Sequence, residues 1–205
     1  MIAPGKGEYD EKGDRIIFTA YSHTYGKKEY ASLIWMDKSG NWHRSENGTV
    51  NEWSSEGSAV VLEDRVRMFY RGDSQTIKYT DFVYDGNQDN YVRKSGSVEI
   101  DTGLVKTARC QLSAIRYSVS YQGKDVVLVS TPTGKNKRRE NGKIYAFAVE
   151  KDKSLTLVST YRFDDGKFAY SCLTELSDGN IAILYEREGG EIVFEIIPFE
   201  KLFLQ

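Results

Sequence analysis

Short runs of β-branched and aromatic residues recur along the whole chain, and turn-forming residues separate each run from the next. Each run has roughly 4–8 residues, the length of a single β-strand. The runs lie at residues 15–21, 30–36, 59–62, 66–70, 112–117, 125–130, 144–149, 155–158, 169–174, 181–185 and 191–197. Gly, Asn and Asp stand between many of them, where they favour tight turns. No helical apolar periodicity lasts beyond a turn or two. We therefore predict an all-β chain, with one short helix near residues 200–204.

The runs fall into four groups, near residues 9–45, 56–84, 108–150 and 155–199. We compare each group with the roughly 40–50 residues of one four-stranded propeller blade. A propeller packs such sheets radially around a central channel, which protects their edges. Residues 110–130 and 170–186 also share a strand–turn–strand layout, a weak internal repeat. We predict a β-propeller of about four blades in a single domain over residues 1–205, with a β-sandwich as the alternative.

Charge and composition exclude several classes of protein. The formal net charge is −2, so we expect no general attraction to nucleic acid or to an acidic membrane surface. No apolar stretch approaches the roughly 20 residues of a membrane-spanning helix. Cys110 and Cys172 are too few for a disulfide scaffold, and we expect both to be small buried apolar side chains. No metal site and no cofactor are predicted.

One turn has a recognisable layout. Residues 36–42, Met-Asp-Lys-Ser-Gly-Asn-Trp, resemble an Asp box, a hairpin turn of several propeller families. The resemblance implies that backbone amides bond to the carboxylate of Asp37 and that Trp42 packs under the turn. Gly40 stands one place later than in the usual motif, and Asn41 replaces the Thr before the Trp. The motif is structural rather than catalytic.

Five segments carry the charged and phenolic residues that indicate a function. They are residues 55–62, 68–72, 137–142, 168–174 and 183–186. Their order and spacing resemble those of bacterial sialidases (neuraminidases), which are glycosidases with a six-bladed propeller. The resemblance covers the carboxy-terminal part of such a catalytic domain. It implies exo-α-sialidase activity on sialylated glycans, in a secreted or cell-surface protein.

The resemblance assigns the chemistry to Tyr170 and Glu56. Tyr170, in Phe-Ala-Tyr-Ser-Cys, corresponds to the nucleophile, and Glu56, before a Val-rich run, corresponds to the base that takes the phenolic proton. Glu52 is a rival for the second role, with a poorer spacing to the Val run. Sialic acid bears a carboxylate on the carbon under attack, so an anionic nucleophile would be repelled and a neutral phenol is not. The bond to Tyr170 would form and break with retention of configuration.

Arginines suit the recognition of that carboxylate, because the guanidinium group is planar and permanently charged. The resemblance maps two of the family's three arginines to Arg71 and Arg139. It maps the glutamate that braces an active-site arginine to Glu186, and it places Gln111 near the pocket.

Two expected parts have no match in the sequence. The family's first arginine lies in an Arg-Ile-Pro segment, and the Asp that acts as its general acid follows shortly after. Arg15-Ile-Ile17 does not match this segment, because the residues around it resemble a later one. We therefore expect the isolated chain to be inactive or nearly so, with the missing groups supplied by upstream sequence or another chain.

Two other functions stay open at this point. A non-catalytic propeller that binds sialic acid would keep the arginines without the acid. A different glycosidase propeller would use two carboxylates, for which Glu56, Asp73 and Asp81 are the candidates.

Overall fold

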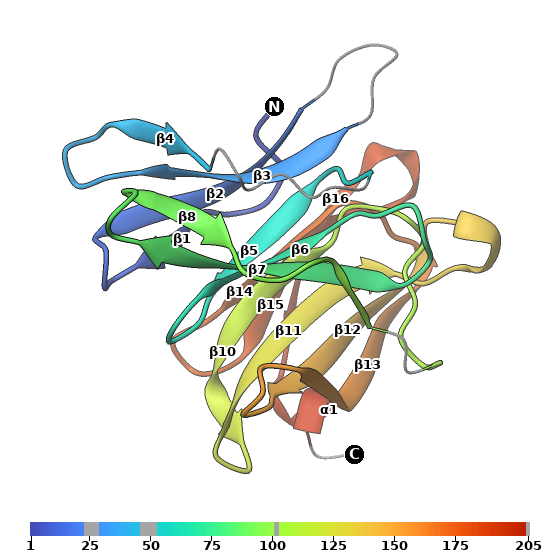
Figure 1. Cartoon of the computed structure of the whole chain (residues 1–205). Helices are drawn as coiled ribbons and strands as arrows, with labels where there is room; N and C mark the ends of the chain where they lie inside the picture. The colour runs from blue at the N-terminus through green and yellow to red at the C-terminus, as the bar shows by residue number, and fades with distance from the viewer. Residues whose placement is uncertain (23–28, 46–52, 101–102, 204–205) are drawn as a thin grey trace.

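The chain folds into four antiparallel sheets that follow one another along the sequence. The computed structural model describes residues 1–22, 29–45, 53–100 and 103–203. The four sheets are arranged as the blades of a propeller (Figure 1). The prediction of a four-bladed propeller is confirmed, and the β-sandwich is wrong because each blade is a separate sheet.

Within each blade, consecutive strands are neighbours. The first blade contains β1 (Glu8–Asp10), β2 (Arg15–Ser22), β3 (Tyr30–Met36) and β4 (Trp42–Arg44). The second contains β5 (Gly57–Val61), β6 (Val66–Tyr70), β7 (Ile77–Asp85) and β8 (Asn90–Arg93), with β9 (Val98–Ile100) also paired to β7. The third contains β10 (Ser113–Tyr121), β11 (Lys124–Pro132), β12 (Glu140–Val149) and β13 (Leu155–Lys167). The fourth contains β14 (Ser171–Glu175), β15 (Ile181–Glu186) and β16 (Ile192–Ile197).

Three short helical elements accompany the strands. They are the 3-10 turns η1 (Lys135–Lys137) and η2 (Glu188–Gly190) and the helix α1 (Glu200–Phe203), which is the helix expected near the end of the chain. Among the described residues, no helix has the length and apolar character needed to cross a membrane.

Two blade boundaries differ from the expected groups. β13 pairs with β12 from Val149↔Leu155 to Glu140↔Lys167, so residues 155–167 complete the third blade rather than open the fourth. The second blade reaches residue 100, because β8 and β9 both pair with β7. Turns within a blade and turns between blades use the same residue types, so local sequence does not separate them.

Three apolar clusters fill the spaces between neighbouring blades. β11 contributes to two of them: Val127 and Val129 face the second blade, and Val126 and Leu128 face the fourth. Successive side chains of a strand point to opposite faces. Because both faces of β11 are buried, its sequence is a continuous apolar run rather than an alternating one.

The outward faces of the first and fourth blades have no neighbouring blade among the described residues. Leu184 and Phe194 on the fourth blade are 46% and 62% exposed. On the first blade, Trp42 is 55% exposed and its ring centroid lies 5.6 Å from that of Phe18. The expectation that Trp42 packs under the Asp-box turn is therefore wrong.

The rest of the Asp box has the expected geometry. Asp37 Oδ1 accepts hydrogen bonds from the backbone amides of Ser39 (2.8 Å) and Asn41 (2.9 Å). Gly40 has φ +81°, a left-handed conformation that Gly adopts without strain. His43 Nε2 lies 2.9 Å from Asp37 Oδ2, and this hydrogen bond is the main reason that the pKa of Asp37 lies far below its usual range.

Side chains link the innermost strands of neighbouring blades. β2, β5, β10 and β14 pack beside one another, but no backbone ladder joins them. Hydroxyl groups take its place: Thr19 Oγ1 donates to Gly57 O (2.7 Å), Ser58 Oγ accepts from Ala114 N (3.0 Å), and Ser113 Oγ accepts from Leu173 N (2.9 Å). These bonds satisfy buried backbone groups where the blades diverge. They also fix where the first residues of β5, β10 and β14 stand.

Candidate functional site

Glu56 and Arg71 lie side by side at one end of the second blade, just outside β5 and β6. Their backbones extend the β5–β6 pairing, because Arg71 N donates to Glu56 O and Ser55 N donates to Arg71 O, each at 2.9 Å. Arg71 Nη1 then donates to Glu56 Oε2 at 2.9 Å. Glu56 is 6% exposed, so this ion pair is shielded from water on the carboxylate side.

Tyr170 reaches the same carboxylate from the fourth blade. It stands immediately before β14, where Glu186 N donates to Tyr170 O at 3.0 Å. The Tyr170 hydroxyl donates to Glu56 Oε1 at 2.9 Å. One oxygen of Glu56 therefore holds the phenol and the other holds the guanidinium group, although 114 residues separate Tyr170 from Glu56.

Arg139 covers the other side of the phenol. Its guanidinium carbon lies 5.4 Å from the centre of the Tyr170 ring, within the range of a cation–π contact. Its backbone is tied to the same strand end, since Phe168 N donates to Arg139 O at 3.0 Å. The structure thus brings both predicted arginines to Tyr170 and Glu56, from three different blades.

Gln111 lies beneath the site and contacts backbone rather than an open pocket. It is fully buried. Its Oε1 accepts from Ser171 N at 3.0 Å, and its Nε2 donates to Ser171 O at 3.1 Å and to Leu112 O at 2.7 Å. Because Ser171 follows Tyr170 directly, Gln111 fixes the backbone that carries the phenol.

Glu186 has an exposed side chain and forms no ion pair with the described residues. It borders a shallow cavity of about 180 Å³ together with Tyr170 and Cys172, and Pro4 and Gly5 close the other side. The arginine that Glu186 would brace is therefore not among the described contacts. The rival base, Glu52, lies outside the described residues.

Burial and charge set the proton affinity of the phenol. Burial is the first cause that raises the pKa of Tyr170, and the hydrogen bond to Glu56 is the second. Arg139 lowers this pKa by a smaller amount. Tyr170 is therefore a neutral hydrogen-bond donor near neutral pH. It needs a base to become a nucleophile, and Glu56 is in contact with its proton.

The structure does not bring Glu56, Asp73 and Asp81 together, as a glycosidase with two catalytic carboxylates would require. Asp81 accepts from Arg67 Nε at 2.7 Å and from Arg65 Nη1 at 3.0 Å, within a buried network. Asp73 has a side chain that is 63% exposed and lies 3.5 Å from Lys78. Glu56, by contrast, contacts a phenol and a guanidinium group, and no hydrogen bond among the described residues joins it to a second carboxyl group. The described residues also contain no cluster of three or more metal-ligating side chains.

Sequence reasoning missed four residues around this site. The Trp53 ring lies 5.8 Å from the guanidinium carbon of Arg71 and 5.7 Å from that of Arg109. The charge of Glu56 raises the pKa of Tyr21, after burial. Cys110 is 1% exposed, and the charges of Arg139 and Arg71 lower its pKa while burial raises it more. Of these four residues, only Trp53 could have been expected near the site from the sequence, because it stands three residues before Glu56.

Comparisons with known proteins identify relatives with one kind of activity. Sialidase B of Streptococcus pneumoniae serotype 4 is 30% identical over 191 residues, which cover 91% of this chain and 26% of that protein. Anhydrosialidase of Macrobdella decora is 28% identical over 223 residues, covering 98% of this chain and 28% of that protein. No protein-family model matches the chain.

A solved structure extends the similarity to the fold. The leech intramolecular trans-sialidase, in complex with 2,7-anhydro-Neu5Ac, matches with a TM-score of 0.78 at 25% identity. The match covers 100% of this chain and 32% of that one. The chain spans less than a third of the length of each of these three relatives. In sequence and in fold, the chain resembles the carboxy-terminal part of a bacterial sialidase catalytic domain.

Proposed function

We propose that the chain provides the nucleophile half of an exo-α-sialidase active site. The observation that carries the proposal is the shared carboxylate of Glu56, which contacts the Tyr170 hydroxyl and Arg71 Nη1 at 2.9 Å each. A phenol with a base on its proton is an activated nucleophile. Arg71, on the same carboxylate as that phenol, and Arg139, over its ring, suit a substrate whose reacting carbon bears a carboxylate.

The proposed reaction has two steps. The Tyr170 oxygen forms a bond to the anomeric carbon while the bond to the leaving glycan oxygen breaks, and the phenolic proton passes to Glu56. The leaving oxygen takes a proton from an acid that is not among the contacts described above. Water then displaces Tyr170. Glu56 returns its proton to the Tyr170 oxygen, the conjugate base of the separate acid takes a proton from the water, and the product keeps the original configuration.

Arg71 has hydrogen-bonding capacity left for a ligand. Its Nη1 is used by Glu56, while its Nε is buried without a hydrogen-bond partner among the described residues. An unpaired buried donor costs roughly 1–3 kcal/mol. Such groups are rare in native structures, and each one calls for an explanation. We take this donor as support for binding of a carboxylate beside Tyr170.

The test uses a substrate that bypasses the acid. In 2,3-difluorosialic acid, fluoride leaves without protonation, so the nucleophile half alone forms a covalent adduct. We expect mass spectrometry of digested protein to find sialyl mass on the peptide containing Tyr170. Tyr170→Phe should form no adduct, and Glu56→Gln should form it roughly 10²-fold or more slowly, because the base is lost. An adduct on another residue, or none despite binding, contradicts the proposal.

The second step has an alternative that the relatives favour. The leech trans-sialidase is named for intramolecular transfer and holds 2,7-anhydro-Neu5Ac, and another relative is named anhydrosialidase. In that case a hydroxyl group of the bound sialic acid, rather than water, displaces Tyr170. The products differ by one water molecule, so mass spectrometry of the released sugar distinguishes hydrolysis from transfer once the missing acid is supplied. A non-catalytic propeller would bind sialosides and form no adduct with the difluoride.

A further inference from the structure

The segment that carries Arg139 concentrates positive charge. Residues 133–143 contain five Lys or Arg and one acid, Glu140, a net charge of +4 on a chain whose total is −2. Arg139 faces Tyr170. The remaining cations are not needed for that contact, so their arrangement calls for a separate explanation.

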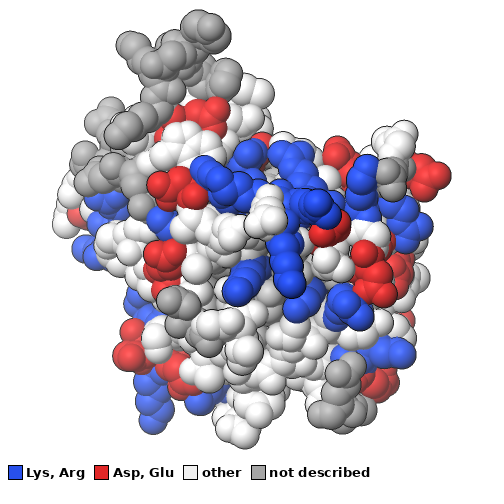
Figure 2. Space-filling view, turned by 90° about the vertical axis from the view of Figure 1, so that its right-hand side faces the viewer, with Lys and Arg blue, Asp and Glu red and all other residues white. Residues whose placement is uncertain are grey.

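These cations line a pocket of about 460 Å³ on the outside of the third blade. Lys135, Arg138, Lys143 and Arg162 border it, with Glu140 as the one acid. Figure 2 views the side of the molecule that carries η1 and shows Lys and Arg side chains gathered across the middle of that face. The pocket, called the Arg138 pocket below, therefore has an excess of three cations on its border.

Most of this charge has no counter-ion within the described chain. Arg162 Nε pairs with Asp165 Oδ1 at 2.8 Å. Lys135, Arg138 and Lys143 form no ion pair among the described residues. Three like charges around one cavity repel one another, and a bound anion would remove that repulsion.

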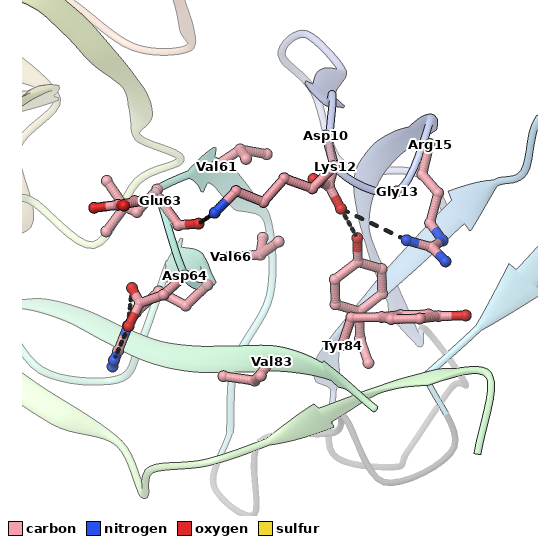
Figure 3. Close-up of a pocket in the computed structure, with 13 residues that line it drawn as sticks. Asp10, Lys12, Gly13, Arg15, Val61, Glu63, Asp64, Val66, Val83 and Tyr84 are labelled. Atoms are coloured by element: carbon pink, nitrogen blue, oxygen red, sulfur yellow. Dashed lines mark hydrogen bonds and ion pairs between the residues drawn. The ribbon is translucent and has the colours of Figure 1, made fainter. Parts of the chain in front are cut away.

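Another polar pocket of the molecule shows the opposite arrangement. It has about 270 Å³ and lies between the first and second blades, beside the β5–β6 turn (Figure 3). Its lining holds as many acids as cations, three of each. Arg15 lies 3.8 Å from Asp10 and Arg65 lies 2.9 Å from Asp64, while Lys12 donates to the backbone carbonyl of Glu63. An excess of cations therefore distinguishes the Arg138 pocket from this one.

The Arg138 pocket adjoins the Tyr170 site through one peptide bond. Arg138 has an extended backbone (φ −67°, ψ 132°). Arg138 borders the pocket, and the next residue, Arg139, lies over the Tyr170 ring. The segment is held in place, since Thr133 N donates to Glu140 O at 3.0 Å and Thr133 Oγ1 to Asn141 O at 2.9 Å. Because neighbouring Cα atoms lie about 3.8 Å apart, the two guanidinium groups lie within the span of one oligosaccharide.

We propose that the Arg138 pocket binds an oxyanion on the glycan that carries the sialic acid. The oxyanion is a sulfate ester on the underlying sugar or the carboxylate of a second sialic acid, which share the geometry that guanidinium and ammonium groups recognise. The proposal rests on the proposed function, because the same glycan occupies Tyr170 and the pocket. It defines a preferred substrate class: sialosides with a second negative charge.

The experiment compares affinities by calorimetry on the whole chain, so no turnover is needed. The ligands are 3′-sialyl-N-acetyllactosamine, its 6-sulfated form, a disialyl oligosaccharide and 6-sulfo-N-acetyllactosamine without sialic acid. One charge-assisted contact corresponds to about tenfold in affinity. We expect the sulfated or the disialyl ligand to bind about tenfold more tightly than the singly charged sialoside. Whichever of these two ligands binds more tightly identifies the source of the oxyanion, a sulfate ester or a second sialic acid.

Arg138→Ala and Lys143→Ala should abolish this gain and leave the affinity for the singly charged sialoside unchanged. Lys38→Ala, which removes an exposed lysine of the first blade, is the matched control and should keep the gain. Equal affinities for all sialosides, or the same loss in the control, overturn the proposal. The proposal is also overturned if a DNA oligonucleotide binds as tightly as the doubly charged sialoside and loses affinity in Arg138→Ala and Lys143→Ala. The pocket would then be a general surface for polyanions.

Failure of the proposed function has a different signature. In that case the singly charged sialoside does not bind, while 6-sulfo-N-acetyllactosamine still binds and loses affinity in Arg138→Ala. If the sialoside binds and the second charge adds nothing, the proposed function stands and the Arg138 pocket is wrong.

Discussion

Gln111 offers the sharpest test of how the fold positions Tyr170. The change is Gln111→Met, which keeps most of the side-chain volume and removes the amide. In the wild type the amide bonds to both Ser171 N (3.0 Å) and Ser171 O (3.1 Å). Ser171 is 6% exposed, so water does not replace these bonds. The variant therefore leaves two buried backbone groups beside Tyr170 without the partner that they had.

The expected loss of stability follows from those two groups and from Leu112 O, which accepts from the same amide at 2.7 Å. An unsatisfied buried donor or acceptor costs roughly 1–3 kcal/mol, so for three groups we expect roughly 3–9 kcal/mol in the free energy of unfolding. For a chain of this length each kcal/mol lowers the melting temperature by about 2–4 °C. Because the volume is conserved, little cavity penalty should be added.

The effect on Tyr170 is a separate measurement. Displacement of a catalytic group by about 1 Å slows reaction by as much as 10²-fold. We expect the rate of adduct formation with 2,3-difluorosialic acid to fall by about that factor, measured well below the melting temperature of the variant. Calorimetry should find the binding of sialosides weakened less, because Arg71 and Arg139 are held by other backbone contacts.

Ser113→Ala provides the matched control. Ser113 Oγ accepts from Leu173 N at 2.9 Å, so it joins the same two strands two residues further along. Its removal should cost about 1–3 kcal/mol and leave the adduct rate unchanged. If both variants lose rate in step with stability, or if Gln111→Met reacts at the wild-type rate, Gln111 has no positioning role.

Three other changes test the electrostatics and the open surface. Glu56→Gln should lower the pKa of Tyr170, because the carboxylate that raises it is gone, so tyrosinate absorbance assigned by comparison with Tyr170→Phe should appear at lower pH than in the wild type. Cys110 should resist iodoacetamide in the folded protein and react on unfolding, because burial raises the pKa of its thiol despite two nearby arginines; rapid labelling of the native chain would contradict this. Phe194→Ser should leave the melting temperature within about 2 °C and reduce aggregation in light scattering, since its side chain is 62% exposed.

The strands were predictable because their cause is local. The apolar run of β11 predicts a strand directly from the sequence, and Gly40 predicts the turn that follows β3. β13 was assigned to the wrong blade because its cause is not local. It is the outer strand of its sheet, and after Val158 only every second residue is apolar: Tyr161 and Phe163 pack against the core, while Arg162 and Asp165 face solvent. This half-buried pattern lacks the continuous apolar run of β11, so the boundary with the next blade is hidden.

The site divides in the same way. Glu56, Arg71, Arg139 and Tyr170 each sit in a short segment whose residue order carries information, and the structure brings them together. The roles assigned to them stay predictions. Tyr21 approaches Glu56 and Arg109 approaches Trp53 from separate segments, and no spacing in the sequence indicates either contact.

The arrangement explains why one carboxylate can serve two purposes. A lone buried carboxylate would be strongly disfavoured, and Arg71 compensates for the burial of Glu56 on one oxygen. The other oxygen is then free to hold the phenol in the geometry from which its proton can leave. Since the two contacts come from different blades, the spacing between blades fixes the distance between base and nucleophile. Gln111 and the serines that join the inner strands set that spacing, so their hydrogen bonds belong to the chemistry of Tyr170 as much as to the stability of the fold.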